Sequence, residues 1–222
     1  MTVDFCYSLM NFLINKNQDG YLSPEQFNTI INQAQNSYMD YMLGEFQQYQ
    51  YKQAQPRVGY SQNQNTRQRL TPIIYGYNLN IDVTGFSPYP GNFQQVDAMW
   101  SMYGFSRIRY VEQERLYSTV NSSIDPVATN PIYLIEDNGF RFYPITTGQA
   151  KLSYVRTPNT IIWGYTLDIN GRPVYDPATS SDPEWYDTDM LEIISRALRM
   201  VGLNLQSNEI SQYANEISKG GQ

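Results

Sequence analysis

The segment NKNQDGYLSPEQF, residues 15–27, carries the side chains of a calcium-binding loop. Asn15, Asn17 and Asp19 stand at alternate positions and Gly20 follows, which is the spacing of the first ligands of an EF-hand loop. Position 12 of such a loop needs a bidentate glutamate, and Gln26 stands there. A carboxamide offers one oxygen where the cation needs two, and Asp19 is the only carboxylate among the first three ligands. The charge of a divalent cation would therefore be poorly compensated.

The same residues can form a turn between two helices. Gly20 can adopt the left-handed conformation that ends one helix, Ser23 can cap the next, and Pro24 suits its first turn. Glu25 and Gln26 favour the N-terminal end of a helix. We therefore predict a helix–loop–helix turn without a metal ion.

A second group of side chains that could bind a metal or act in catalysis is acidic and lies toward the C-terminus. Paired carboxylates can hold a hard cation or act as the acid and base of a glycosidase. A helix N-terminus also favours negative charge, and Asp182-Pro183 has the form of a cap followed by a first-turn proline. We favour helix capping. Trp185 and Tyr186 can stack on sugars, but such residues are also common where an amphipathic helix begins. The carboxylates concerned are Asp182, Glu184, Asp187, Asp189 and Glu192.

The composition removes several kinds of chemistry. The 222 residues contain no histidine and one cysteine, so histidine-dependent triads, thiolate zinc sites and internal disulfides are excluded. We expect Cys6 to act as a small hydrophobic residue. The formal net charge of −6 argues against high-affinity binding to a nucleic-acid backbone. Because no nucleophile elbow, phosphate-binding loop or dinucleotide fingerprint is present, we expect neither catalysis nor a metal or cofactor.

Hydrophobic spacing predicts helices at both ends of the chain and strands between them. An i, i+3, i+4, i+7 pattern runs from Phe27 to Met42, and shorter patterns cover residues 3–14, 191–205 and 210–217. We predict an α+β fold, in which a small bundle of N- and C-terminal helices carries an inserted antiparallel, sandwich-like β region. The predicted segments are a helical hairpin at 1–46, a Gln/Asn-rich arm at 47–69 that orders on a partner, the β-rich insertion at 70–180, and the closing helices at 181–222.

Two Asn-Gly pairs predict hairpins in the β-rich region. Asn138-Gly139 and Asn170-Gly171 each separate two β-prone runs, which favours a tight turn. One helix, near Val111 to Val120, is predicted to interrupt the strands.

Aromatic residues are abundant, with 20 tyrosines and 3 tryptophans. Aromatic platforms bind carbohydrate, but tyrosine also dominates large protein contact surfaces. Arginines at alternate positions of a strand point to one face and can grip the carboxylates of a neighbour; 67 and 69 form one such pair and 107 and 109 another. We expect contacts with other subunits. The predicted subunit-interface residues are Tyr49, Tyr51, Tyr60, Arg67, Arg69, Tyr75 and Tyr77.

Two stretches, NPIYLIEDNGFRFYPITTGQAKLSYVRTPN and PVYDPATSSDPEWYDTDMLEIISRALRMVGLNL, resemble virion neck proteins of crAss-like tailed bacteriophages. That family shows an Asn-Pro-aromatic strand, a hairpin, a strand ending in Tyr-x-Arg-x-Pro, a loop, and an Asp-rich entry into a closing helix. The N-terminal half is similar in style to the adaptor rings that join portal to tail in short-tailed phages. The matching residues are Asn130, Pro131, Tyr133, Tyr154, Arg156, Pro158 and the stretch from Asp182 to Asp189.

The resemblance implies a structural role in the virion neck or tail, with assembly in the host cytoplasm. Copies of the chain would form a homo-oligomeric ring, a dodecamer, below the portal protein and would dock the next ring or the tail proteins. Double-stranded DNA would pass through the ring without sequence-specific binding, and no membrane is involved. One alternative is a carbohydrate-binding module of a virion or cell-surface protein. Another is a glycosidase that uses Asp182 and Glu184.

Overall fold

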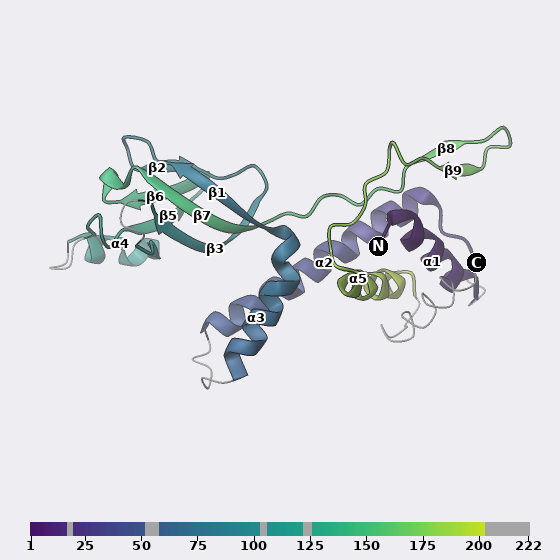
Figure 1. Ribbon diagram of the computed structural model, residues 1–222, viewed down its shortest axis with the longest axis horizontal. Helices are drawn as coiled ribbons and strands as arrows, with labels where there is room; N and C mark the ends of the chain where they lie inside the picture. Colours follow the sequence, from purple (N-terminus) through teal and green to yellow (C-terminus); the bar gives the residue numbers. More distant parts are fainter. Residues whose placement is uncertain (17–19, 52–57, 103–105, 122–125, 203–222) are drawn as a thin grey trace. The chain divides into compact units, whose positions relative to one another are not determined.

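The chain divides into two compact units, Met1–Pro72 together with Pro158–Gln222, and Ile73–Thr157. The computed structural model describes residues 1–16, 20–51, 58–102, 106–121 and 126–202 (Figure 1). Over these residues the predicted α+β class is confirmed, because N- and C-terminal helices flank a β-rich middle. The β-rich unit is shorter than the predicted insertion at 70–180, since residues 158–180 belong to the helical unit.

The helical unit is built from amphipathic helices whose apolar faces meet. Its core combines residues from both ends of the chain, including Leu9, Phe27, Tyr38 and Ile194, all of them fully buried. The closing helix predicted at 210–217 lies outside the described residues. The described helices of this unit are α1 (Val3–Lys16), α2 (Pro24–Tyr51), α3 (Val58–Leu70) and α5 (Asp187–Met200).

The start of α2 has the predicted capping residues. The Ser23 hydroxyl oxygen accepts a hydrogen bond from the backbone N–H of Gln26 at 3.3 Å, and the Gln26 side chain accepts one from the backbone N–H of Ser23 at 3.1 Å. This reciprocal pair is a capping box. Gly20 has a φ of 104°, a left-handed value that favours glycine. Asn15, the first ligand position of the hypothetical calcium loop, lies inside α1.

Side-chain carboxamides of α2 bind the backbone of an extended segment that lies far away in sequence. The Asn32 amide donates to the carbonyl oxygen of Ile161 at 2.7 Å and its oxygen accepts the N–H of Ile161 at 2.9 Å. Asn28 makes the same pair of bonds with Trp163, at 3.3 and 2.7 Å. We call this set of contacts, extended by Gln35, the carboxamide ladder.

Asn28 and Asn32 can both reach the extended segment because the spacing of residues on the helix matches the spacing of residues on an extended chain. Residues four apart on a helix are separated by about 6 Å along its axis, and alternate residues of an extended chain by about 6.6 Å. Gln35 lies three residues beyond Asn32, so it is outside the four-residue repeat, but its longer side chain still donates to the carbonyl oxygen of Asn159 at 3.0 Å, and its own oxygen accepts the indole N–H of Trp185 at 3.2 Å. The carboxamides thus pair with alternate residues 159, 161 and 163 as the edge of a β-strand would. This pairing explains why residues after 158 belong to the helical unit.

Over its described residues, 73–102, 106–121 and 126–157, the β-rich unit contains two sheets. One has the order β1-β7-β3 and is antiparallel throughout; the other has the order β2-β6-β5-β4, with its only parallel pair between β4 and β5. The predicted helix near Val111 to Val120 is present as α4 (Gln113–Val120). The strands are β1 (Ile74–Asn80), β2 (Phe86–Pro88), β3 (Phe93–Ser101), β4 (Arg109–Tyr110), β5 (Ile132–Glu136), β6 (Gly139–Tyr143) and β7 (Gln149–Arg156).

Residues from both sheets form one aromatic core. Phe140 stands at its centre, with ring centroids of Tyr89, Phe93 and Tyr133 at 4.7, 5.4 and 5.8 Å, all in edge-to-face geometry. Two residues of the family pattern, Tyr133 and Tyr154, belong to this core. The buried members of the core are Leu79, Met99, Ile108, Tyr133, Phe140, Phe142, Ala150, Leu152 and Tyr154.

The first predicted hairpin is present, but its turn is displaced by one residue. Glu136 pairs with Gly139, so Asp137 and Asn138 form the two-residue turn between β5 and β6. Gly139 begins β6, and a Cβ atom there would lie 2.3 Å from the carbonyl oxygen of Ser87. Glycine is therefore required by the close approach of β2 and not by the turn.

The predicted arm at 47–69 is largely helical where it is described. Helix α2 continues to Tyr51, and α3 covers the last part of the segment. The side chain of Thr66 is buried there, as is that of Leu70 just beyond the segment. The sequence criterion considers the apolar content of the segment alone, whereas α3 gains its order by packing on α2.

We predict that Asn32→Ala lowers the free energy of unfolding by about 2 kcal/mol, because the buried backbone N–H and carbonyl of Ile161 lose their partners. Urea denaturation followed by tryptophan fluorescence measures this, since Trp163 and Trp185 lie in the helical unit. Asn36→Ala is the matched control, because Asn36 is exposed on the same helix and should change stability by about 0.5 kcal/mol or less. Equal midpoints for the two variants would contradict the role of the ladder.

Cys6 should resist alkylation in the native protein. Burial raises the pKa of its thiol to about 12, so at about pH 8 roughly one molecule in ten thousand carries the reactive thiolate. We expect iodoacetamide to label Cys6 only in denaturant, as measured by mass spectrometry over time. Rapid labelling without denaturant would show that α1 is not packed as described.

Candidate functional site

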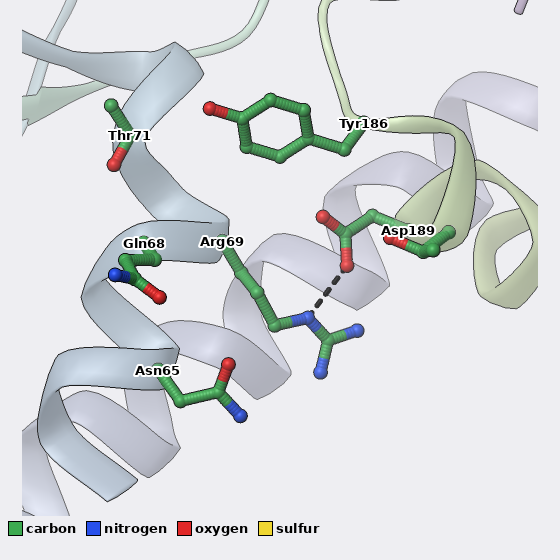
Figure 2. A pocket seen from close by; sticks show the side chains of 7 residues that line it. Asn65, Gln68, Arg69, Thr71, Tyr186 and Asp189 are labelled. Atoms are coloured by element: carbon green, nitrogen blue, oxygen red, sulfur yellow. Dashed lines mark hydrogen bonds and ion pairs between the residues drawn. The ribbon is translucent and has the colours of Figure 1, made fainter. Parts of the chain in front are cut away.

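A shallow pocket lies between the C-terminal end of α3 and the start of α5, within the helical unit (Figure 2). Its volume is about 320 Å³, which is at the small end of ligand sites. One tyrosine lies on its walls, and every other lining side chain is polar or charged and not aromatic. The lining residues are Asn65, Gln68, Arg69, Thr71, Tyr186, Thr188 and Asp189.

The floor of the pocket is a hydrogen-bonded network around Asp189, whose side chain is 0% exposed. The Arg69 Nε donates to Asp189 Oδ1 at 2.6 Å, and the Tyr38 hydroxyl donates to the same oxygen at 2.8 Å. Arg69 Nη2 also donates to the Tyr38 oxygen at 2.6 Å. Burial, followed by the hydrogen bond to Asp189, raises the pKa of Tyr38 well above its usual range. The hydroxyl therefore stays protonated and remains a donor.

The second carboxylate oxygen of Asp189 has no hydrogen-bond partner. Oδ2 is buried, and in Figure 2 it points away from Arg69 toward the space beside Tyr186. A buried acceptor without a donor costs about 1 to 3 kcal/mol, and more when it is charged. Such an atom at a pocket wall indicates that a donor from water or a ligand completes the site.

The predicted acidic cluster does not converge on one point. Asp182 Oδ1 accepts the backbone N–H of Val3 at 2.7 Å, so it caps α1 and not the helix that follows it, which begins only at Asp187. Within the described ranges, no group of His, Cys, Asp or Glu side chains could hold a metal ion. The other carboxylates have separate partners: Glu184 binds the backbone and side-chain amides of Asn159, Asp187 the terminal amine of Met1, and Glu192 the guanidinium of Arg196.

The aromatic residues of the same stretch have different surroundings. Trp185 is buried and its ring centroid lies 5.1 Å from that of Tyr38, so it cannot stack on an external sugar. Tyr186 is half exposed and flanks the pocket. Of the two aromatic residues singled out from the sequence, only Tyr186 can contact a ligand.

The predicted interface residues are distributed over both units. Tyr75 and Tyr77 lie half exposed on β1, which is an edge strand of its sheet. Arg67 and Arg69 lie on a helix instead of a strand, where residues two apart point about 200° apart. Accordingly, Arg67 is exposed whereas Arg69 turns inward to Asp189. The remaining three, Tyr49 and Tyr51 of α2 and Tyr60 of α3, have side chains outside the described residues.

Arg107 and Arg109 point to the same side of the chain, as their alternate positions predict. Arg107 and Arg109 are both exposed, and Ile108 between them is buried in the aromatic core. These two guanidinium groups therefore lie on one face of the β-rich unit.

A second exposed feature is the hairpin of β8 (Tyr165–Leu167) and β9 (Pro173–Tyr175), where Asn170-Gly171 predicts it. Ile169 is fully exposed at the turn, Leu167 is 66% exposed and Val174 is 49% exposed. Asp168 fixes the turn by accepting the N–H groups of Asn170 and Arg172, both at 2.8 Å. These apolar residues were not selected from the sequence, although their position beside an Asn-Gly turn is a signal that could have identified them.

Comparison with known proteins gives no assignment: no protein-family model matches this chain, and no curated protein matches it. Among the described helices, none is both long enough and apolar enough to span a membrane.

We predict that Arg69→Ala destabilises the helical unit by about 2 to 3 kcal/mol, because the buried side chain of Asp189 loses its ion-pair partner. This value is at the low end for a buried pair since the guanidinium is 38% exposed. Urea denaturation measures the loss. Gln64→Ala on the same helix is the control, because Gln64 is exposed, and it should change stability by about 0.5 kcal/mol or less. If both substitutions cost the same, the network does not stabilise the unit.

Proposed function

We propose that this chain is a structural subunit of a phage head-to-tail connector ring below the portal. The resemblance to neck proteins suggests this role, and the exposed apolar tip of the β8–β9 hairpin is the observation that supports it best. Connector subunits must hold sister copies through surfaces that their own fold leaves uncovered. The proposed partners are further copies of the chain, the portal protein, and the next ring or tail proteins.

The hairpin is suited to insertion into a neighbouring molecule. Leu167 pairs with Pro173, and Val174 pairs with Thr166, so Leu167 and Val174 lie on opposite faces of the two-stranded ribbon. With Ile169 at the turn, the ribbon exposes apolar side chains on both faces and at its end. A ribbon that only lay on a surface would need one apolar face. Two apolar faces favour a recess in another chain.

The base of the hairpin is rigidly held within its own unit. The Trp163 ring stacks on that of Tyr7 with centroids 4.2 Å apart, and Tyr165 and Tyr175 lie 6.0 and 5.7 Å from Trp163. An isolated two-stranded hairpin is marginally stable. Anchoring at the base keeps this one formed in the free subunit, which lowers the entropic cost of docking.

A second uncovered surface lies on the edge strand β1. Tyr75, Tyr77 and Leu79 point to the same side of the strand, and their partners on β7 are the buried residues Tyr154, Leu152 and Ala150. Leu79 is itself buried, but the two tyrosines extend past the core and are half exposed. Broad, half-polar tyrosine rings at a sheet edge are typical of protein contact surfaces.

The charge of the chain is compatible with a DNA channel that does not bind DNA. A net charge of −6 per copy, repeated around a ring, repels phosphates. Double-stranded DNA would then pass without sequence-specific contacts. We propose no catalytic step for any residue of the chain.

The double substitution Leu167→Ser with Ile169→Ser should abolish assembly while leaving the subunit folded. Burial of one aliphatic side chain contributes about 1.5 to 3 kcal/mol to the free energy of association. Each interface of the ring would lose this contribution in the variant. Sedimentation velocity and negative-stain microscopy, with the purified protein alone and with portal protein, measure the outcome.

Val83→Ser is the matched control, because Val83 is 92% exposed at a turn of the other unit. It should assemble as the unaltered protein does. Rings that form normally from the double-serine variant would rule out the hairpin as an interface, and a protein that stays monomeric alone and with portal would refute the connector role.

A further inference from the structure

The pocket between α3 and α5 is a second candidate binding site, and it is independent of the connector role. Its wall contains Asp189 Oδ2, a fully buried carboxylate oxygen without a donor, which points into the space beside Tyr186 (Figure 2). A ligand that satisfies this atom must carry an N–H or O–H group.

The local charges favour an uncharged ligand. The guanidinium of Arg69 already lies 2.6 Å from Asp189 Oδ1, so a second cation would be repelled at close range. An anion would meet the unpartnered Oδ2 of the same carboxylate. Neutral groups that both donate and accept, such as hydroxyls, avoid both penalties.

The lining residues favour a sugar over a polypeptide backbone. Asn65, Gln68, Thr71 and Thr188 offer side-chain donors and acceptors, and the half-exposed ring of Tyr186 provides an apolar face. The lining residues belong to α3, to the 3-10 turn Thr71–Ile73, to the first turn of α5 or, for Tyr186, to the N-cap of α5, and none lies on a strand whose edge a peptide backbone could pair with.

We propose that this pocket binds one neutral saccharide unit. A ring hydroxyl donates to Asp189 Oδ2, the carboxamides of Asn65 and Gln68 bind further hydroxyls, and the C–H face of the sugar packs on Tyr186. Asp189 is held in place for this contact by Arg69 and Tyr38. About twelve heavy atoms at ordinary ligand efficiency support a dissociation constant on the order of 1 mM.

Saturation-transfer NMR with a panel of methyl glycosides tests the proposal on the full chain. The panel comprises the methyl glycosides of glucose, galactose, mannose and N-acetylglucosamine at millimolar concentration. Tyr186→Ala and Gln68→Ala change exposed side chains, so both variants should fold, which circular dichroism checks. We expect at least one glycoside to bind the unaltered protein and to lose detectable binding in both variants.

Two controls locate the site. Arg67→Ala alters the same helix away from the pocket lining, and Tyr75→Ala removes an exposed tyrosine of the other unit; both should bind as the unaltered protein does. Absence of binding by every glycoside overturns the proposal, as does binding that persists in both pocket variants. N-acetylglycinamide serves as the peptide probe, and its binding in place of the glycosides would assign the pocket to a backbone amide and overturn the saccharide assignment.

Discussion

The carboxamide ladder between α2 and residues 159–163 is the contact on which the helical unit depends. It joins the first quarter of the chain to the part that follows the β-rich unit, so both ends of the chain share one core. A hydrophobic contact would tolerate sliding, but the carboxamides of Asn28 and Asn32 each have one donor side and one acceptor side that must meet the carbonyl and the N–H of a particular residue. The ladder therefore fixes the register of the extended segment against α2. Some of the abundant carboxamides of this chain thus serve internal structure as well as the surface.

The position of Asp189 in the pocket is connected to this ladder by hydrogen bonds and a ring contact. Gln35, the last member of the ladder, accepts the indole N–H of Trp185, and the Trp185 ring packs edge-on against Tyr38. Tyr38 in turn donates to Asp189. A continuous series of directional contacts therefore connects residue 159 with the floor of the pocket. Buried polar networks of this kind are costly when one member is missing, which makes the arrangement specific as well as stable.

Short-range features were predictable from the sequence, and long-range pairings were not. The capping box at Ser23 and Gln26, helix α4 and the hairpin at Asn170-Gly171 follow from neighbouring residues, and each is present. The apolar pattern at 191–205 correctly predicts that Ile194 and Leu198 of α5 are buried, and the buried face is wider than the pattern because Met190, Ile193 and Ala197 also belong to it.

The errors share one physical cause. Asp182 caps α1, a helix 179 residues away, and Arg69 reaches Asp189 across 120 residues, so no local pattern could reveal either partner. The same reason hid the pocket, whose two walls come from α3 and α5. Asn-Gly is a turn signal and so predicts Gly139 in the turn, whereas the need for glycine comes from the close approach of β2, about fifty residues earlier.

The ladder also bears on the proposed docking of the hairpin. Trp163 is its last backbone partner and at the same time the aromatic anchor of the β8–β9 base. The direction in which the ribbon leaves the helical unit is thus set by Asn28 on one side of Trp163 and Tyr7 on the other. A hairpin whose base is held by both hydrogen bonds and aromatic contacts loses little conformational entropy on binding. In the proposed assembly with identical copies, the base of the hairpin would set the angle between subunits, and its exposed aliphatic tip would supply the affinity.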